Sequence, residues 1–407
     1  MPAPHALDPR DLLHRLTAET PSMIADLERL VAAESPSSDG DALRACRDVL
    51  AEIGTRLLGT APSVLPDDPT DGRPGGLLWR LGPADARPVL LVGHFDTVWP
   101  LNTLQRRPFR VDGARATGPG VFDMKAGLIQ GLYGVARLRE MSGEDSPVAF
   151  LVTADEEIGS PAGGRVVTEW ARKSRAALVL EGAADDGALK HARKGWSFYD
   201  IRVEGVAAHA GLEPGKGRNA LTDLARIVVA LESLAADDDR ITVTPTMAHA
   251  GTTQNTVPDR AYVTVDVRVP DVVAQKEIDA ELRRLVAATA QLPYEITGGP
   301  NRPPLEEASA TDLLETARIC ADDLGLHWPG SAAVGGISDG NLCAAAGTPT
   351  LDGLGAVGGG PHAEHEWVDV SCMAERAALV GRMVGILPEA VSPGRVRVTG
   401  PYGLRCN

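Results

Sequence analysis

The chain has few cysteines, and their spacing would build neither a disulfide framework nor a thiolate metal site. The five cysteines are odd in number and scattered, and none belongs to a C-x-x-C pair. We therefore expect small core or surface residues rather than ligands or half-cystines. The five are Cys46, Cys320, Cys343, Cys372 and Cys406.

Positive charge and long apolar runs are also scarce. Lys and Arg number 40 against 55 Asp and Glu, for a net charge of -15. Nucleic acids and anionic membranes require a cationic face, so we expect neither as a partner. No apolar run approaches the ~20 residues of a membrane-spanning helix. The N-terminus, MPAPHALDPRDLL, lacks the cationic start and apolar segment of a secretory signal, which makes the cytoplasm the expected location.

Three apolar runs indicate an α/β domain. They are PVLLVG at 88–93, VAFLVT at 148–153 and AALVL at 176–180, and each is typical of a buried parallel strand. Apolar residues at helical spacing over 128–138 lie between the first two runs. Strands and helices therefore alternate along the first half of the chain.

The pattern changes near Arg193. Apolar and polar residues alternate over 199–203 and 263–269, as in strands covered on one face, and amphipathic helices are predicted at 219–234 and 275–289. This order predicts an inserted β-α-β-β-α-β domain. We place the inserted domain at residues 193–303 and the discontinuous first domain at residues 1–192 and 304–407.

Potential metal ligands follow each of the three predicted parallel strands. His94 and Asp96 follow the first, the acids Asp155 to Glu157 follow the second, and Glu181 follows the third. The carboxyl ends of parallel strands meet at one sheet edge, so these side chains should converge. Three consecutive acids repel one another unless a positive charge lies nearby, which indicates a bound cation.

Two further candidates lie in glycine-rich segments. Asp123 precedes a predicted helix in GPGVFDMKAG, and His362 lies in GGGPHAEHEWV. Imidazoles with carboxylates and no thiolates are typical of a catalytic zinc site. Two histidines and three carboxylates suffice for two ions if one carboxylate bridges them. Two zinc ions ~3.5–4 Å apart would acidify a shared water and polarise a scissile carbonyl.

Simpler interpretations exist for several of these residues. His94 alone could be an ordinary hydrogen-bonded histidine, and Glu156 and Glu157 could be acids that stabilise a helix N-terminus. His365 is an alternative to His362 within the same segment. The loops GGIS and GGGP lack the Lys-Ser/Thr and strand-helix context of a phosphate-binding loop, so we reject that function.

Eight motifs in order resemble the co-catalytic zinc metallopeptidases, a family that includes glutamate carboxypeptidase, acetylornithine deacetylase and succinyl-diaminopimelate desuccinylase. The similarity extends from about Leu90 to Val370, and glutamate carboxypeptidase is the member that the chain most resembles. The motifs are HFDTV, GPGVFDMKAG, TADEEIGS, VLEGA, AAHAGLEPGKGRNA, TQNTVPDRAYVTVDVR, GGISDGN and GGGPHAEHEWV. The resemblance implies a catalytic domain with a mixed, mainly parallel sheet and an inserted ferredoxin-like lid and dimerisation domain.

The resemblance also implies a ligand set for two zinc ions, although Co²⁺ or Mn²⁺ would suit similar ligands. Asp123 would bridge the ions, His94 and Glu181 would complete one site, and Glu157 and His362 would complete the other. The family pattern places this last histidine four residues before a glutamate, which selects His362 rather than His365.

Three further residues take catalytic roles by the same resemblance. Glu156 would be the general base, and Asp96 would orient His94. His209, in AHAG, would reach the active site of the partner subunit in a homodimer and stabilise the oxyanion. His209 could equally be a loop histidine with no catalytic part.

The resemblance also implies substrate ligands: Asn255 and Arg268 match family positions that bind the carboxylate or amide of a substrate, and Arg302 is a further candidate for the same role. The planar guanidinium of Arg can hold a carboxylate through two hydrogen bonds. Arg268 lies two residues from Asp266 and could instead pair with that acid, and the NRPPL segment around Arg302 follows the family pattern only loosely.

The expected function is that of a di-zinc carboxypeptidase that releases a C-terminal amino acid, with glutamate the first candidate, from an acyl or peptidyl group. The alternative is an N-acyl amino acid deacylase or desuccinylase with the same chemistry. A third hypothesis is a catalytically silent homologue that binds amino-acid derivatives, against which the intact Glu156 and the full ligand set argue.

Overall fold

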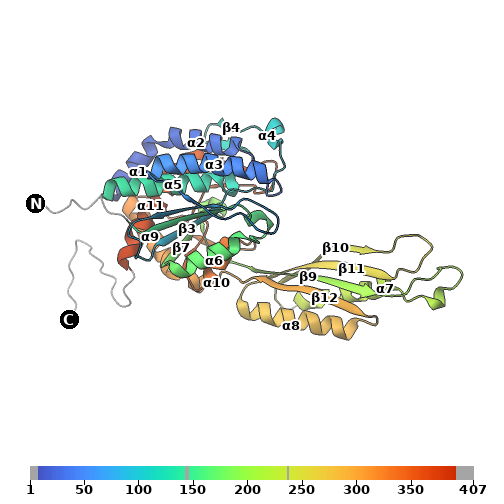
Figure 1. Ribbon diagram of the computed structural model, residues 1–407. Helices are drawn as coiled ribbons and strands as arrows, with labels where there is room; N and C mark the ends of the chain where they lie inside the picture. Colours follow the sequence, from blue (N-terminus) through green and yellow to red (C-terminus); the bar gives the residue numbers. More distant parts are fainter. Residues whose placement is uncertain (1–7, 143–145, 236–237, 391–407) are drawn as a thin grey trace, which may run out of the picture. The chain divides into compact units, whose positions relative to one another are not determined.

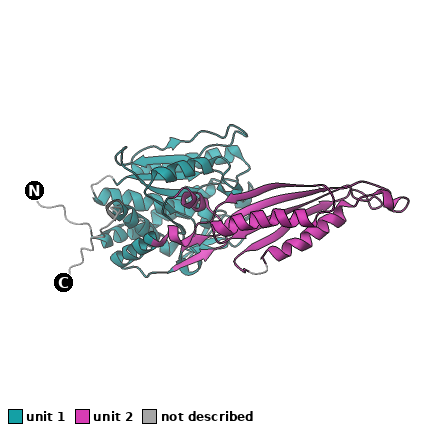
Figure 2. Ribbon diagram, turned by 90° about the horizontal axis from the view of Figure 1, so that it is seen from below, with its two compact units in different colours: residues 1–189, 312–330, 348–407 teal, residues 190–311, 331–347 magenta. Residues whose placement is uncertain are grey.

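The computed structural model describes residues 8–142, 146–235 and 238–390. Cys406 and the first seven residues of the N-terminal segment lie outside this part of the chain. The described residues form two compact units, one within the ranges 1–189, 312–330 and 348–407 and the other within the ranges 190–311 and 331–347 (Figure 2). The second unit thus includes residues 331–347, which the sequence analysis assigned to the first domain.

The first unit is built on a mixed six-stranded sheet in the order β1-β2-β6-β3-β7-β14. The last four strands in this order are parallel, whereas β1 and β2 join antiparallel at one edge. The strands are β1 (Ser63–Val64), β2 (Leu77–Leu81), β6 (Val148–Thr153), β3 (Val89–His94), β7 (Ala176–Val179) and β14 (Thr350–Leu351). The three predicted parallel strands are confirmed as β3, β6 and β7. Every residue of these strands is buried, which explains their continuous apolar sequences.

Helices cover both faces of this sheet (Figure 1). α1, α2, α3 and α5 lie over one face, and α6 lies over the other. The helices of the first unit are α1 (Pro9–Ala18), α2 (Thr20–Ala32), α3 (Gly40–Leu58), α4 (Thr103–Arg106), α5 (Ala126–Ser142), α6 (Gly163–Lys173), α9 (Thr311–Leu324) and α11 (Met373–Ala390). α5 is almost entirely buried, which agrees with the apolar positions that predicted it.

A small antiparallel sheet completes the first unit. Its order is β15-β16-β5-β4, and its strands are β15 (Gly358–Gly359), β16 (Trp367–Asp369), β5 (Arg115–Thr117) and β4 (Arg110–Asp112). This sheet brings the segment that carries His362 into register with the segment that precedes Asp123.

The second unit contains the predicted β-α-β-β-α-β order. Its antiparallel sheet is arranged β10-β11-β9-β12 and packs against two helices around an apolar core. The elements are β9 (Gly195–Glu204), α7 (Ala220–Leu231), β10 (Thr242–Ala250), β11 (Arg260–Val269), α8 (Val272–Thr289) and β12 (Tyr294–Arg302). Asn219 and Asp271 cap the first turns of α7 and α8 through backbone N–H groups. β8 (Leu189–Arg193), β13 (Ser331–Val334) and α10 (Asp339–Ala345) complete the element order.

None of the helices in the described residues is long and apolar enough to cross a membrane.

Candidate metal centre

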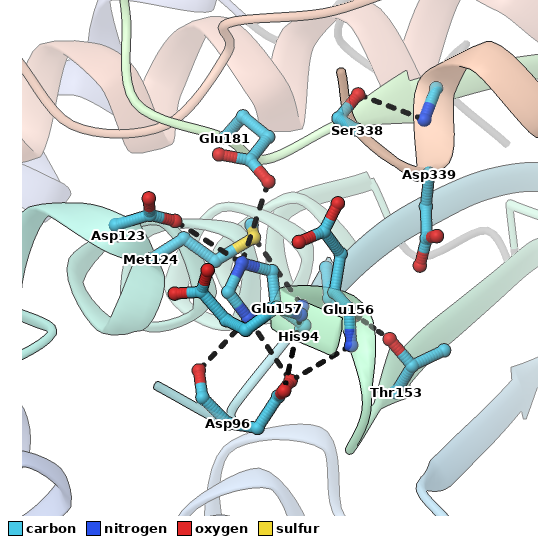
Figure 3. Close-up of polar contacts among 12 residues, drawn as sticks. His94, Asp96, Asp123, Met124, Thr153, Glu156, Glu157, Glu181, Ser338 and Asp339 are labelled. Atoms are coloured by element: carbon cyan, nitrogen blue, oxygen red, sulfur yellow. Dashed lines mark hydrogen bonds and ion pairs between the residues drawn. The ribbon is translucent and has the colours of Figure 1, made fainter. Parts of the chain in front are cut away.

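The carboxyl ends of β3, β6 and β7 bring three candidate ligand positions to one sheet edge, and the turn before α5 adds a fourth. His94 is the last residue of β3, and Glu157 lies in a 3-10 turn, Glu156–Ile158, that follows β6. Glu181 follows β7 by two residues, and Asp123 lies in the turn Val121–Lys125, which leads into α5 and in which the backbone of Asp123 itself is not helical. Figure 3 shows His94 between Asp96 on one side and Asp123 and Glu181 on the other.

Two groups of three side chains form at this edge, and Asp123 belongs to both. His94, Asp123 and Glu181 form one group, and Asp123, Glu157 and His362 form the other. Within each group the potential ligand atoms lie within 4.8 Å of one another. The structure therefore brings together all five residues that the sequence analysis proposed as ligands.

The two oxygens of Asp123 face different histidines. Oδ1 lies 3.2 Å from Nε2 of His94, and Oδ2 lies 3.3 Å from Nε2 of His362. Nε2 of His94 is also 3.5 Å from Oε1 of Glu181, and Nε2 of His362 is 3.0 Å from Oε2 of Glu157. A carboxylate with one oxygen toward each group has the orientation needed to bridge two ions.

Asp96 connects His94 with the acidic turn after β6. Its carboxylate is fully buried and accepts hydrogen bonds from the backbone N–H groups of Glu156 at 3.1 Å and Glu157 at 3.2 Å. Nδ1 of His94 lies 3.0 Å from the Asp96 carbonyl oxygen and 3.3 Å from Oδ1. An Nδ1–H that donates to Asp96 leaves Nε2 of His94 free to bind a cation.

Glu181 and Asp123 are also brought together through their neighbours in sequence. A Cβ on Gly182 would lie 2.3 Å from the Phe122 ring, so only glycine allows this ring to pack against the segment after β7. The close packing positions the turn that contains Asp123 beside Glu181.

Burial and the close ion pairs shift the pKa of several groups. Burial acts to lower the pKa of His94, but hydrogen bonds with Asp123, Asp96 and Glu181 outweigh it and raise that pKa well above 6.5. Hydrogen bonds with Asp123 and Glu157 raise the pKa of His362 to about 10. Burial acts to raise the pKa of Asp123, yet hydrogen bonds with the two histidines hold it well below its ordinary value. Burial raises the pKa of Glu157.

The donor set fits divalent cations. It contains imidazole nitrogens and carboxylate oxygens without thiolates, as in catalytic zinc sites. Oε1 of Glu157 is buried and has no hydrogen-bond partner among the described residues. A buried carboxylate oxygen without a donor is costly, and a cation between Glu157 and Asp123 would remove that cost.

His362 rather than His365 joins this cluster. Its backbone has a φ of 60°, a left-handed conformation that is uncommon for residues other than glycine. Such a conformation persists only where the surrounding structure imposes it, and it often occurs at functional sites. His365 belongs to neither group.

His209 and Asn255 lie together in the second unit. The Ala210 N–H donates to the Asn255 carbonyl oxygen at 2.8 Å, and both residues are exposed. Nδ1 of His209 accepts hydrogen bonds from the N–H groups of Gly211 at 3.1 Å and Leu212 at 3.0 Å. In the neutral ring these bonds place the proton on Nε2, which is then a hydrogen-bond donor.

The two arginines proposed as substrate ligands already have acidic partners. Arg268 pairs with Asp266 through Nε at 2.9 Å and Nη2 at 3.0 Å, as the simpler interpretation anticipated. Arg302 is only 1% exposed, and its Nη1 donates to Asp339 at 3.0 Å and to the Ser338 carbonyl oxygen at 2.9 Å. Burial and this pairing favour a structural role for Arg302 over substrate binding.

Sequence reasoning missed several residues that support the site. Ser37 donates to Oδ2 of Asp96 at 2.7 Å, and the backbone N–H of His94 lies 3.3 Å from the Met124 sulfur. Glu366, noted only for its spacing from His362, accepts hydrogen bonds from the turn that contains Asp123. The four-residue spacing from His362 could have indicated Glu366, whereas no sequence pattern indicates Ser37.

Comparison with known proteins identifies relatives of this chain. Residues 90–385 match the family model described as peptidase family M20/M25/M40. Carboxypeptidase G2 from Pseudomonas sp. (strain RS-16) is 27% identical over 391 residues, which cover 92% of this chain and 91% of that protein. Succinyl-diaminopimelate desuccinylase from Methylobacterium sp. (strain 4-46) is 28% identical over 397 residues, which cover 90% and 96% respectively.

Solved structures share the fold. An aminopeptidase from Bacillus cereus superposes with a TM-score of 0.73 at 22% identity, covering 90% of this chain and 98% of that chain. A Bacillus subtilis protein described as a dinuclear metal-binding peptidase superposes with a TM-score of 0.68 at 18% identity, covering 92% and 99%.

Proposed function

This chain belongs to peptidase family M20/M25/M40, and we propose that it is a di-zinc carboxypeptidase that releases a C-terminal amino acid from acyl or peptidyl substrates. Glutamate is the first residue to test, because the motifs of this chain most resemble those of glutamate carboxypeptidase. Carboxypeptidase G2, which is similar over 92% of the chain, supports the carboxypeptidase reaction. The observation that carries the proposal is the pair of three-residue groups that share Asp123.

The proposed ligands follow from that geometry. His94, Asp123 and Glu181 would hold one ion, and Asp123, Glu157 and His362 would hold the other. Two divalent ions at this site would lower the pKa of water and polarise a substrate carbonyl. Zinc suits the nitrogen and oxygen donors, and Co²⁺ or Mn²⁺ would suit them as well.

Glu156 is the proposed general base. It lies beside Glu157 in the same 3-10 turn, and the bond from its N–H to Asp96 fixes the backbone of that turn. Glu156 would take the proton from the attacking water and later deliver it to the leaving amine. Its neighbour would remain a metal ligand, which gives the consecutive acids separate functions.

We propose that the protein acts as a homodimer in which His209 serves the active site of the partner subunit. The Nε2–H that its local hydrogen bonds favour is suited to donate to a developing oxyanion. The second unit also exposes single apolar side chains, with Val229 on α7 68% exposed and Met247 on the edge strand β10 60% exposed. Exposed apolar residues on an edge strand and a neighbouring helix are suited to pair with a second copy.

The proposed substrate has a free carboxylate, with Asn255 and Arg268 as its candidate ligands. To bind it, Arg268 would exchange or share its contact with Asp266. An N-acyl amino acid deacylase or desuccinylase is the second candidate, because succinyl-diaminopimelate desuccinylase is 28% identical over 90% of this chain.

The test is amino-acid release by the zinc-loaded protein from acyl-glutamates, dipeptides, and N-acetyl and N-succinyl amino acids. Glu156→Gln should abolish release, whereas the matched control Glu169→Gln should retain it, because the Glu169 side chain is 61% exposed on α6. Glutamate release supports the carboxypeptidase, and turnover restricted to N-acyl substrates supports the deacylase. No turnover by a fully zinc-loaded protein would contradict both.

A further inference from the structure

Glu366 has a buried carboxylate that accepts four hydrogen bonds. Its exposed fraction is 0%. Oε1 accepts from the backbone N–H groups of Phe122 at 2.9 Å and Asp123 at 3.1 Å. Oε2 accepts from the Gly120 N–H at 2.9 Å and from the indole N–H of Trp99 at 3.0 Å. Each oxygen thus has two donors, and the carboxylate belongs to neither group of potential metal ligands.

These donors come from two segments that carry proposed ligands, and Glu366 itself comes from a third. Trp99 follows His94 and Asp96 in the segment after β3, and Gly120 to Asp123 form the turn before α5. In its own segment, the Glu366 N–H donates to the Ala363 carbonyl oxygen at 2.9 Å, which closes the turn just after His362. One side chain therefore connects the segments that carry His94, Asp123 and His362, through an indole N–H in the first and backbone N–H groups in the second.

Packing alone does not account for this arrangement. A buried carboxylate requires hydrogen bonds or a counter-charge, and an apolar residue of similar size would fill the space at a lower desolvation cost. Three of the four donors are backbone N–H groups of the single turn that contains Asp123. Their alignment on one carboxylate fixes the direction in which that turn presents the Asp123 side chain.

We propose that Glu366 is the positioning residue that holds Asp123 between the two metal sites and keeps the His362 segment in register with it. The inference rests on the proposed di-metal function. Outer hydrogen-bond partners of metal ligands typically change metal affinity or activity 10- to 100-fold when they are replaced. Because Glu366 acts on the shared ligand, its loss should weaken both sites rather than one.

The test is Zn²⁺ binding by the full chain, measured by competition with a chromophoric chelator, for the wild type and Glu366→Gln. The amide of Gln presents N–H groups to backbone donors, so the turn must shift. We expect affinity to fall roughly 10- to 100-fold at both sites. The visible spectrum of the Co²⁺-loaded variant should change, and kcat should fall more than KM rises.

Asp223 provides a matched control in the second unit. It is 1% exposed, and its carboxylate accepts hydrogen bonds from the backbone N–H groups of Gln291 and Leu292. Asp223→Asn thus disturbs a buried carboxylate of the same kind, and we expect it to leave Zn²⁺ affinity and the Co²⁺ spectrum unchanged.

Trp99→Phe keeps the inference testable if Glu366→Gln does not fold. This variant removes one donor to Oε2 and retains the carboxylate, so Zn²⁺ affinity should fall by a smaller factor in the same direction. Unchanged Zn²⁺ affinity in the folded Glu366→Gln variant, or in Trp99→Phe where that is the only one that folds, would overturn the inference. A wild type that binds no Zn²⁺ would instead contradict the proposed function itself.

Discussion

Asp123 is the residue that the two groups of potential metal ligands share. It is close to two histidines, and each of its oxygens faces a different one. Without metal, the positive charge that it requires comes from the protonated imidazoles, whose pKa values the surrounding carboxylates raise. Protons and divalent ions therefore compete for the same nitrogen atoms.

This competition predicts that apparent Zn²⁺ affinity rises with pH. The pKa of His362 is about 10 in the metal-free protein, against an ordinary value of 6.5, so its ring must lose a proton before it binds metal. Affinity should increase by up to about tenfold per pH unit for each histidine between pH 6.5 and pH 9. Competition with a chelator of known pH dependence measures the apparent Zn²⁺ affinity, and an affinity that does not change with pH would contradict the expectation.

Whereas Zn²⁺ affinity should rise with pH, the stability of the metal-free protein should fall. A histidine whose folded pKa is raised stabilises the folded state fully below its unfolded pKa of about 6.5, and that stabilisation is lost as the pH rises toward about 10. The unfolding temperature of chelator-treated protein should therefore fall as the pH rises from about 6.5 toward about 10. The unfolding temperature of zinc-loaded protein should fall less over the same pH range.

At the residue scale, ligand types were predictable and supporting contacts were not. His94, the acids after β6 and Glu181 were found because each follows an apolar strand. The contacts of Glu366 join positions that are 243 to 267 residues apart, and no local pattern signals such a partner. Arg302 lies in a segment that follows the family pattern only loosely, and its burial against Asp339 depends on the fold and could not be predicted from the sequence.

At the scale of elements, the site depends on how closely the segments after parallel strands can pack. The segment after β7 approaches the turn before α5 at Gly182 and Phe122. The strands themselves were predictable because burial on both faces makes them continuous apolar runs. The turn at Val121–Lys125, with a cis peptide bond between Asp123 and Met124, had no sequence signal beyond the glycines that flank it.

Gly182→Ala should therefore disturb the metal centre without removing any ligand. The new Cβ would lie 2.3 Å from the Phe122 ring, which must move together with the adjacent Asp123. We expect a loss of about 1–3 kcal/mol in the free energy of unfolding and weaker Zn²⁺ binding. Chemical denaturation and chelator competition measure the two effects.

Gly215→Ala is the matched control for this substitution. A Cβ at Gly215 meets no atom within 4 Å, so the variant should bind Zn²⁺ like the wild type. If Gly182→Ala bound Zn²⁺ as tightly as Gly215→Ala, the prediction that the contact between Gly182 and Phe122 supports the metal centre would be wrong.

At the scale of the whole molecule, the chain divides its proposed functions between two units. The proposed metal ligands and Glu156 belong to the first unit, and His209 belongs to the second. The inserted fold was predictable because two of its strands, β9 and β11, alternate strictly and its helices are amphipathic. The assignment of residues 331–347 to the second unit was not, because it depends on the pairing of β13 with β8.

The proposed dimer predicts complementation between two inactive variants. Glu156→Gln lacks the base, and His209→Ala lacks the oxyanion donor for its partner. A mixed dimer would contain one site with both groups, so mixing equal amounts after subunit exchange should restore about a quarter of wild-type activity. Sedimentation velocity on each variant confirms that both remain dimers. No recovery in a mixture shown to contain mixed dimers would contradict the shared active site.

The central claim is tested most directly by counting the Zn²⁺ ions bound per chain. The protein is dialysed to equilibrium against Zn²⁺, and its metal content is measured by inductively coupled plasma mass spectrometry. The account predicts two ions per chain for the wild type and one each for Glu181→Gln and Glu157→Gln. Asp123→Asn should retain neither ion at the same free Zn²⁺ concentration, because both sites share this ligand. Fewer than two ions in the wild type, or loss of only one ion in Asp123→Asn, would contradict a bridged two-metal centre.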